Sequence, residues 1–373
     1  MTEALDPAGS RRPAPGGPAT LSVVVIGRNE AATIGRLVES VLAETAPFPR
    51  DKVVVVDSAS TDGMADVAAR YPVEVVRLLP GQPLTAAAGR NVGVSRTSGE
   101  LVLFLDGDME LHPGWLAAAM SLLERRDDVA GCTGTLIERP EMPGPAGPPP
   151  SPGRGPVRWT EVRFLGGAAL YRRGVLVGVG GFRPFVRSDE EPELCLRIRR
   201  SGRTLLESDH PVAFHYTAPG DSIATVVGRW RRGLYLGAGQ NLRHLAGTPL
   251  LVPYLRERGF GIVPLAAITA GLACATASLA GHRRWLRGYG ALVGGFVVAD
   301  VARRRGDLHG TARAMVQRLA IADGTVRGFL LARRDPGEHP ARLEVVREAP
   351  PGAAAPLVST APCRSGPPPG TAG

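Results

Sequence analysis

The triplet Asp106-Gly107-Asp108 is the part of this sequence most obviously able to do chemistry. It directly follows an apolar run at 101–105 (LVLFL), a pattern that predicts a strand buried in a sheet. Two carboxylates at a strand end can point into one cleft, and the glycine between them lets a ligand approach the backbone. Oxygen ligands of this kind suit Mg²⁺ or Mn²⁺, which bridge to substrate phosphates. Acidic pairs are also common in plain turns, but the position after a buried strand favours a metal site.

Polar residues follow two other apolar runs. Arg28-Asn29-Glu30 comes after the run at 21–26, and Asp57 comes after the run at 52–56. Ligands of open α/β sheets bind beyond the carboxyl ends of the strands, so we expect these residues and the triplet to share one site.

Strand and helix patterns alternate over the first 137 residues. Strands are predicted at 21–26, 52–56, 73–78, 101–105 and 129–137, with helices from 31, at 62–71, at 85–97 and at 113–125. Repeated units of this kind predict an α/β fold with a doubly wound, mostly parallel sheet. Further along, 188–201 (SDEEPELCLRIRRS) predicts a helix with acids in its first turn, arginines in its last and Gly202 as its stop.

Five collinear segments resemble one known family. They are LSVVVIGRNEAATIGRLVESVL (21–42), VVVVDSASTDGMADVA (53–68), AAAGRNVGVSRTSGELVLFLDGDMELHPGWL (86–116), GGAALYRRGVLVGVGGF (166–182) and SDEEPELCLRIRRSG (188–202). Together they are similar to the family 2 glycosyltransferases, inverting enzymes of the GT-A fold, over about residues 20–245.

The resemblance implies a role for each matching residue. Asn29, Glu30 and Asp57 would hold the nucleoside of a nucleotide-diphosphate sugar, and Arg90 and Asn91 would lie near its ribose and phosphates. Asp106 would contact ribose or metal, Asp108 would ligate the divalent cation, and His215 would be a further metal or diphosphate ligand. The sequence departs from the family pattern at Ile26-Gly27 and at Ser58, which leaves the base of the nucleotide open.

An inverting transfer needs a base that deprotonates the acceptor hydroxyl. The resemblance makes Glu191 this base; the choice over Glu190 and Glu193 rests on alignment alone, and these acids could instead only cap the helix. The segment Arg229-Trp230-Arg231 resembles an element that contacts the diphosphate or the acceptor, and a basic helix facing anionic lipid explains it equally well.

Composition narrows the class of protein. The net charge of +9 is carried almost wholly by arginine, and no nucleic-acid-binding signature accompanies it, so we expect no nucleic-acid partner. Four isolated cysteines argue against a structural zinc site and a disulfide framework. The first residues lack a signal-peptide pattern, which favours the cytoplasm for the catalytic part.

The chain is expected to divide into four parts. Residues 1–20 and 336–373 are predicted as disordered tails, 21–245 as the catalytic domain with a mobile Pro/Gly-rich loop at 140–156, and 246–335 as a helical, membrane-associated region.

The C-terminal apolar runs raise the question of a membrane. The uncharged segment 259–281 is roughly 34 Å long as a helix, against about 30 Å of hydrocarbon. A second run at 288–299 is too short to cross alone, and arginines flank both. A span, a shallow insertion at anionic headgroups and a soluble helical hairpin all remain open, with membrane association favoured.

The sequence therefore predicts a metal-dependent inverting glycosyltransferase at the cytoplasmic face of the cell membrane, with a lipid or cell-envelope glycan acceptor. A nucleotidyltransferase is disfavoured because no Gly-rich basic loop follows the first strand. A catalytically silent membrane-bound scaffold or sugar-binding relative is disfavoured by the joint retention of Asp106, Asp108, Glu191 and His215.

Overall fold

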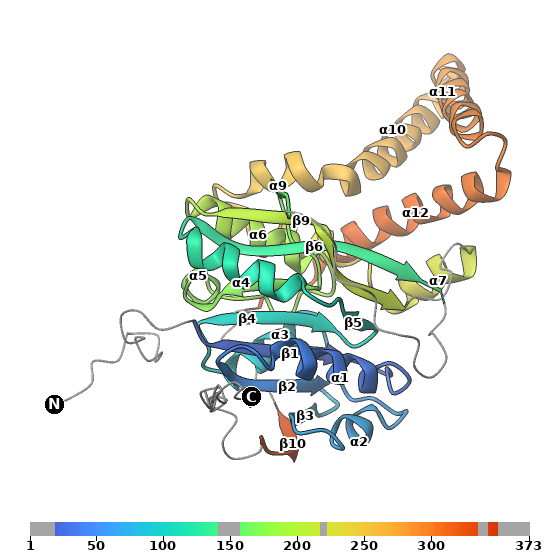
Figure 1. Cartoon of the computed structure of the whole chain (residues 1–373). Coiled ribbons are helices and arrows are strands. Elements are labelled where there is room, and N and C mark those ends of the chain that lie inside the picture. Colours follow the sequence, from blue (N-terminus) through green and yellow to red (C-terminus); the bar gives the residue numbers. More distant parts are fainter. Residues whose placement is uncertain (1–18, 141–156, 217–221, 335–341, 350–373) are drawn as a thin grey trace, which may run out of the picture.

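The computed structural model describes residues 19–140, 157–216, 222–334 and 342–349 (Figure 1). The loop predicted at 140–156 lies outside these ranges except for its first residue, as do most of the two predicted tails. The strands are β1 (Leu21–Gly27), β2 (Arg50–Asp57), β3 (Glu74–Leu78), β4 (Leu101–Asp106), β5 (Met109–Leu111), β6 (Val129–Arg139), β7 (Trp159–Glu161), β8 (Ala169–Arg172), β9 (Thr204–Tyr216) and β10 (Leu343–Arg347). The helices are α1 (Ile34–Thr45), α2 (Met64–Ala68), α3 (Ala86–Ser95), α4 (Trp115–Arg125), α5 (Arg173–Gly178), α6 (Glu190–Arg200), α7 (Ile223–Arg231), α8 (Gly237–Leu245), α9 (Leu251–Arg258), α10 (Ile262–Leu279), α11 (Arg283–Arg303) and α12 (Leu308–Leu330), with a 3₁₀ turn, η1 (Gly259–Gly261).

One mixed sheet forms the centre of the molecule. Its order is β10-β3-β2-β1-β4-β8-β6-β9-β5, with β7 paired to β9. The pairs β3–β2, β2–β1 and β1–β4 are parallel, as the repeated strand-helix units predict. Beyond β4 the sheet differs from that pattern, because β8 runs antiparallel between β4 and β6 while β6 and β9 are parallel to each other. The predicted α/β class is confirmed, with a mixed second half.

The apolar run at 23–26 in β1 packs on both faces of this sheet. Val23 and Val25 belong to the core that α1, α2 and α4 cover, whereas Val24 and Ile26 belong to the core on the face of α3 and α6. Successive side chains of a strand point to opposite faces, so a strand between two helical layers is apolar throughout. A Cβ on Gly93 of α3 would lie 2.1 Å from Val24, and this close packing requires glycine.

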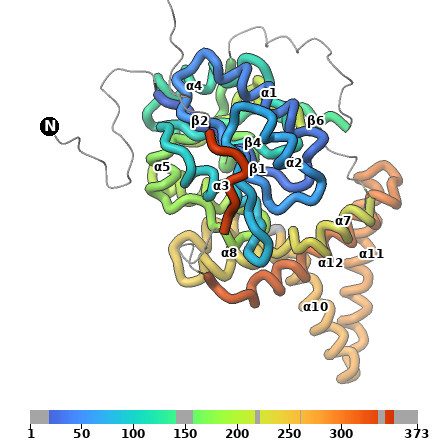
Figure 2. The backbone as a smooth tube through the Cα atoms, turned by 90° about the horizontal axis from the view of Figure 1, so that it is seen from below, coloured from blue at the N-terminus to red at the C-terminus, as the bar shows by residue number. Residues whose placement is uncertain are grey.

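The region predicted to be helical, 246–335, contains α9, η1, α10, α11 and α12. Figure 1 shows α10 and α11 projecting from the sheet and α12 returning along them, and the perpendicular view of Figure 2 shows the same arm. Helix α12 packs against α7 and α8, so the region is not an independent appendage.

The last described segment corrects a prediction. Residues 336–373 were expected to be a disordered tail, but Leu343–Arg347 form β10, which pairs antiparallel with β3 at the sheet edge. The short run LEVVR (343–347) lies among polar and Pro-rich residues, and only its distant partner β3 makes it a strand.

Candidate active site at the carboxyl ends of the parallel strands

The strand register brings the predicted polar residues to one edge of the sheet. Ile26 of β1 lies opposite Asp106 of β4, and Gly27 lies opposite Asp57 of β2. The chain then turns through Gly107 into β5, whose pairing with β9 places Met109 opposite His215. The triplet and His215 therefore meet, although 107 residues separate Asp108 and His215 in the sequence.

The loops after β1 and β2 are joined into one rim. Asn29 has a left-handed backbone, with φ of 62°, and its Oδ1 accepts from the backbone N–H of Thr61 at 2.8 Å. Its own N–H donates to Ser60 Oγ at 2.8 Å, and the N–H of Ala31 donates to Asp62 Oδ2 at 2.8 Å. Sequence reasoning named Asn29 and Glu30 but missed Ser60, Thr61 and Asp62, although they follow Asp57 within the same matching segment.

Asp57 is buried and already engaged by the protein. Its carboxylate accepts from Arg77 Nε at 3.0 Å and from the N–H of Ser60 at 3.0 Å. Arg77 lies on β3 and also pairs with Glu344 of β10 at 3.7 Å. Asp57 thus fixes the shape of the loop that follows β2.

One carboxylate oxygen of Asp108, Oδ1, is buried without a hydrogen-bond partner among the described residues, as expected of a residue that binds a cation. The other oxygen, Oδ2, lies 3.2 Å from His215 Nε2. The other ring nitrogen of His215 lies 3.0 Å from Glu138. The hydrogen bond to Asp108, followed by that to Glu138, raises the pKa of His215 to about 9 against the opposing effect of burial.

Negative charge is crowded at this edge. Burial raises the pKa of Glu30 to about 7, and the charges of Asp108, Asp62 and Asp106 add to the shift. A bound cation would stabilise such a cluster, because it offsets the repulsion between the carboxylates.

The donor set fits a divalent metal in part. Within the described ranges, no three His, Cys, Asp or Glu side chains are already grouped as a metal site. The orphaned Asp108 Oδ1, the adjacent Asp106 and His215 supply protein ligands of the right kind, and Mg²⁺ or Mn²⁺ commonly completes its shell with substrate phosphate oxygens.

Arg90 is the centre of a second cluster of charges. It is 2% exposed and donates through Nη1 to Glu190 at 3.0 Å, and its Nη2 donates to Asp106 at 2.9 Å. Glu191 Oε1 lies 2.9 Å from Nη1. Burial alone would lower the pKa of Arg90, but the charges of Glu191, Asp106 and Glu190 raise it well above its ordinary value. Arg90 therefore links the end of β4 to the start of α6.

The three glutamates of α6 differ in environment. Glu193 is 1% exposed and is paired with Arg183 at 2.8 Å and Arg197 at 2.7 Å, which together hold its pKa below the ordinary value despite burial. Glu190 is nearly as buried, and burial followed by the charge of Glu191 raises its pKa to about 8 although Arg90 opposes the shift. Glu191 has the most exposed carboxylate of the three, at 18%.

Asn91 has two backbone partners. Its Nδ2 donates to the carbonyl of Phe182 at 2.6 Å, and its Oδ1 accepts from the N–H of Phe182 at 3.1 Å. Asn91 thus fastens α3 to the segment before α6. The structure gives both Arg90 and Asn91 protein partners where contact with the donor was expected.

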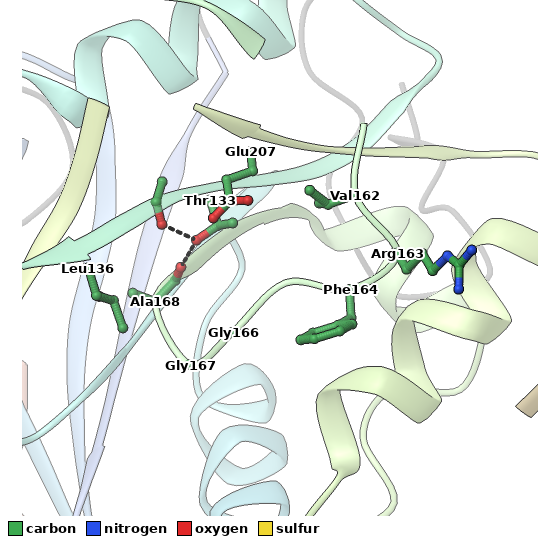
Figure 3. A pocket seen from close by; sticks show the side chains of 10 residues that line it. Thr133, Leu136, Val162, Arg163, Phe164, Gly166, Gly167, Ala168 and Glu207 are labelled. Atoms are coloured by element: carbon green, nitrogen blue, oxygen red, sulfur yellow. Dashed lines mark hydrogen bonds between the residues drawn. The ribbon is translucent and has the colours of Figure 1, made fainter. Parts of the chain in front are cut away.

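A pocket of about 510 Å³ lies between β6, β9 and the segment that leads into β8 (Figure 3). Its lining consists of Thr133, Gly134, Leu136, Val162, Arg163, Phe164, Gly166, Gly167, Ala168 and Glu207. A Cβ on Gly167 would lie 2.1 Å from Asp106 Oδ2 and 3.2 Å from Arg90 Nη2, so this wall of the pocket touches the catalytic candidates. Thr133 Oγ1 donates to the carbonyl of Ala168 at 2.6 Å and fixes the wall to β6.

The basic segment Arg229-Trp230-Arg231 forms the end of α7. Trp230 Nε1 donates to Asp323 of α12 at 2.6 Å, and the guanidinium of Arg327 lies 5.7 Å from the Trp230 ring centroid. These contacts fasten α7 to the returning helix of the arm. That this segment binds a diphosphate or an acceptor stays a prediction.

Comparison with known proteins finds similarity to glycosyltransferases. The model of the glycosyl transferase family 2 matches residues 22–191. Glycosyltransferase AglE of Haloferax volcanii is 31% identical over 106 residues, covering 28% of this chain and 35% of that protein. Pre-mycofactocin glycosyltransferase of Mycobacterium tuberculosis is 26% identical over 292 residues, covering 68% of this chain and 56% of that protein. The chain thus spans about a third to just over half of the length of these relatives.

A solved structure shares the fold. The mannosyltransferase PcManGT from Pyrobaculum calidifontis, in complex with GDP-Man and Mn²⁺, aligns with a TM-score of 0.52 and 20% identity, covering 86% of this chain and 89% of that one. The matched segment 22–191 contains the triplet, Arg90 and Glu191, which the structure has brought to one edge of the sheet. The segment 22–191 thus matches the glycosyl transferase family 2, and the chain has the GT-A type of α/β fold.

Proposed function

We propose that the chain is a metal-dependent inverting glycosyltransferase that moves a sugar from a nucleotide-diphosphate donor to a lipid or cell-envelope glycan acceptor. The observation that carries this proposal is the bridge formed by Arg90. It joins Asp106, beside the candidate metal ligand Asp108, to Glu191, the candidate base, at 2.9 Å on each side.

The donor would bind across the ends of β1, β2 and β4. The rim formed by Asn29, Ser60 and Thr61 suits a nucleoside, because it presents polar groups at the topological switch of the sheet. That PcManGT is described with GDP-Man and Mn²⁺ supports a nucleotide sugar and a divalent metal here. Asp106, Asp108 and His215 would hold the metal, which offsets the negative charge of the departing diphosphate.

Glu191 would act as the general base. Its carboxylate takes the proton of the acceptor hydroxyl while the hydroxyl oxygen forms a bond to the anomeric carbon. The bond from that carbon to the diphosphate oxygen breaks on the opposite face, so the configuration inverts. Arg90 holds this carboxylate in place at 2.9 Å, whereas Glu193 is already paired with two arginines.

The acceptor would enter through the pocket bounded by Gly167. The pocket touches Asp106 and Arg90 through this glycine, and Leu136, Val162 and Phe164 make much of its lining apolar. An apolar wall suits the lipid portion of a lipid-linked acceptor. Pre-mycofactocin glycosyltransferase, a relative that aligns over 68% of this chain, makes an acceptor similar to pre-mycofactocin a second candidate.

The arm of α10 and α11 would hold the enzyme at the cytoplasmic face of the membrane. None of the 18 residues of α10 is buried, and α10 is the one helix of the described residues that is long and apolar enough to span a membrane. Leu292 and Val298 of α11 are 71% and 68% exposed, and Arg283, Arg284 and Arg287 lie near the tip of the hairpin, where anionic headgroups would attract them.

Thermal melting with nucleotide diphosphates and nucleotide sugars, with and without Mn²⁺, tests the donor. A ligand that binds the native state raises Tm, so we expect one nucleotide to raise it strongly only when Mn²⁺ is present. Transfer of labelled sugar to a polyprenyl-linked sugar, whose hydroxyls can accept it, and to pre-mycofactocin then separates the two acceptor candidates. If no nucleotide raises Tm and no donor is turned over, the chain is a silent relative. Formation of nucleotide sugar from sugar phosphate would instead identify a nucleotidyltransferase.

Flotation with anionic vesicles tests the membrane proposal. A truncation after residue 250 is a poor probe, because it removes α12, which packs against α8. The double variant Leu272→Asp/Leu292→Asp instead adds charge to side chains that are 62% and 71% exposed. We expect it to lose flotation and keep its Tm, while Val177→Asp on α5, 39% exposed, floats like the wild type. Wild-type protein that does not float with any vesicle would exclude the membrane role.

A further inference from the structure

Helix α9 does more than lead into the arm, because it contacts the residue that precedes the candidate catalytic glutamates. Asp189 directly precedes Glu190 and Glu191, and its backbone is left-handed, with φ of 63°. Such a conformation is rare for a residue with a side chain, and it persists only where the surroundings impose it. The question is therefore which groups hold Asp189.

Two residues of α9 hold its carboxylate, which is 9% exposed. Tyr254 Oη donates to Asp189 Oδ2 at 2.6 Å, and Arg258 Nε donates to the same oxygen at 3.2 Å. The second Arg258 donor, Nη2, bonds to Asp189 Oδ1, so the guanidinium meets both oxygens of the carboxylate. A paired, bidentate contact of this kind fixes orientation as well as position.

Helix α8 holds the backbone of the same segment. Asn241 Nδ2 donates to the carbonyl of Asp189 at 3.0 Å, and Gln240 binds the backbone of Arg187 and Phe185 at 3.0 and 2.8 Å. A Cβ on Gly237 would lie 1.9 Å from the carbonyl oxygen of Ser188, so the helix lies directly against the chain. The path into α6 is thus determined by α8 and α9.

Arg258 also reaches the pocket. Its guanidinium lies 5.6 Å from the ring centroid of Phe164, which lines the pocket. The adjacent Glu257 accepts from Arg199 of α6 at 2.6 Å, and Arg199 donates to the carbonyl of Arg163 in the pocket wall at 2.8 Å. One turn of α9 therefore contacts the residue before α6, the last turn of α6 and the pocket loop.

We propose that Tyr254 and Arg258 are positioning residues, which align the carboxylate of Glu191 with an acceptor in the pocket through Asp189 and Phe164. The proposal rests on the proposed function, because it takes Glu191 as the base. Neither residue touches the rim formed by Asn29 and Ser60, so the donor site should be unaffected. The C-terminal helices would then complete the catalytic site as well as carry the arm.

Steady-state kinetics of Arg258→Ala and Tyr254→Phe test the proposal. A misplacement of about 1 Å costs on the order of 10²-fold in rate, so we expect kcat for transfer to fall 10- to 100-fold in Arg258→Ala. Arg258→Lys should recover part of this loss, because it keeps a charge but not the two-pronged contact. The rise in Tm caused by the nucleotide with Mn²⁺ should stay the same. Arg256→Ala, an exposed neighbour on the same helix, is the matched control and should behave as the wild type.

A double-variant cycle separates positioning from a general loss of structure. If Arg258 acts through the base, Arg258→Ala should cost little in a Glu191→Gln background, because the group that it positions is already gone. An equal loss in both backgrounds would overturn the proposal, as would unchanged kcat in Arg258→Ala and Tyr254→Phe. Should Arg258→Ala fail to fold, the milder Tyr254→Phe, combined with Glu191→Gln, gives the same decision. Failure of the wild type to bind any nucleotide or transfer any sugar would refute the proposed function itself.

Discussion

Gly167→Ala should inactivate the enzyme through a single methyl group. A Cβ at this position would lie 2.1 Å from Asp106 Oδ2 and 2.9 Å from its Cγ, whereas ordinary contacts begin near 3.4 Å. The carboxylate must therefore move by roughly 1 Å, and it cannot move freely, because Arg90 holds its other oxygen at 2.9 Å. Since a shift of about 1 Å in a catalytic constellation costs on the order of 10²-fold, we expect kcat/KM to fall by about that factor.

The neighbouring glycine provides the control. A Cβ on Gly166 would meet nothing within 4 Å, and neither glycine has a positive φ, so both variants accept alanine without backbone strain. Transfer kinetics and the Mn²⁺-dependent rise in Tm should be measured on both proteins. Gly166→Ala should match the wild type, while Gly167→Ala should lose turnover and part of the metal response. If the two variants are equally active, the contact between the pocket wall and Asp106 has no part in catalysis.

Three further substitutions test individual assignments. Asp108→Ala should abolish the stabilisation by Mn²⁺, and at about pH 6 it should also lower the metal-free Tm, because it removes the partner of protonated His215; an undiminished Mn²⁺ effect would remove Asp108 from the metal site. Glu191→Gln should lower transfer turnover by about 10²–10⁴-fold at unchanged nucleotide affinity, and an active Glu191→Gln beside an inactive Glu190→Gln would move the base. The pKa of His215 is raised from the ordinary value of 6.5 to about 9 in the folded protein. Protonated His215 therefore stabilises the metal-free protein fully below pH 6.5, and this stabilisation is lost as the pH rises through 9. His215→Ala should accordingly lower Tm more at about pH 6 than at about pH 10, and equal losses at both values would contradict the ion pair with Asp108.

The parallel half of the sheet could be predicted from the sequence, because local patterns specify it. Apolar runs of four or five residues predict β1, β2 and β4, and polar residues after each run predict where the site lies. The helix start at Glu190 and its end before Gly202, which has φ of 83°, follow from charge placement and a glycine. Pro113 was expected inside α4, but the helix begins at Trp115 after a left-handed Gly114.

The remaining features depend on contacts between distant parts of the chain. The antiparallel placement of β8 between β4 and β6 has no local signal, since its four residues are also compatible with a helix. The burial of Arg90 among three carboxylates requires α3, β4 and α6 to be assembled first. The partner of Asn91 could not be predicted either. The sequence match includes Asn91 but does not show whether its side chain binds a ligand or, as here, the backbone of Phe182.

The pairing of β10 with β3 has a consequence for how the protein is made. Hydrogen bonds between Gln82 and Arg342 join positions 260 residues apart, so the outer edge of β3 stays open on the ribosome until residues 342–347 have emerged. An open edge strand is a template for pairing with other chains, and the apolar helix α10 emerges before β10 does. The nascent protein therefore exposes a strand edge and an apolar helix at the same time. Its yield on synthesis should depend on chaperones or on a lipid surface, even if the finished fold is stable.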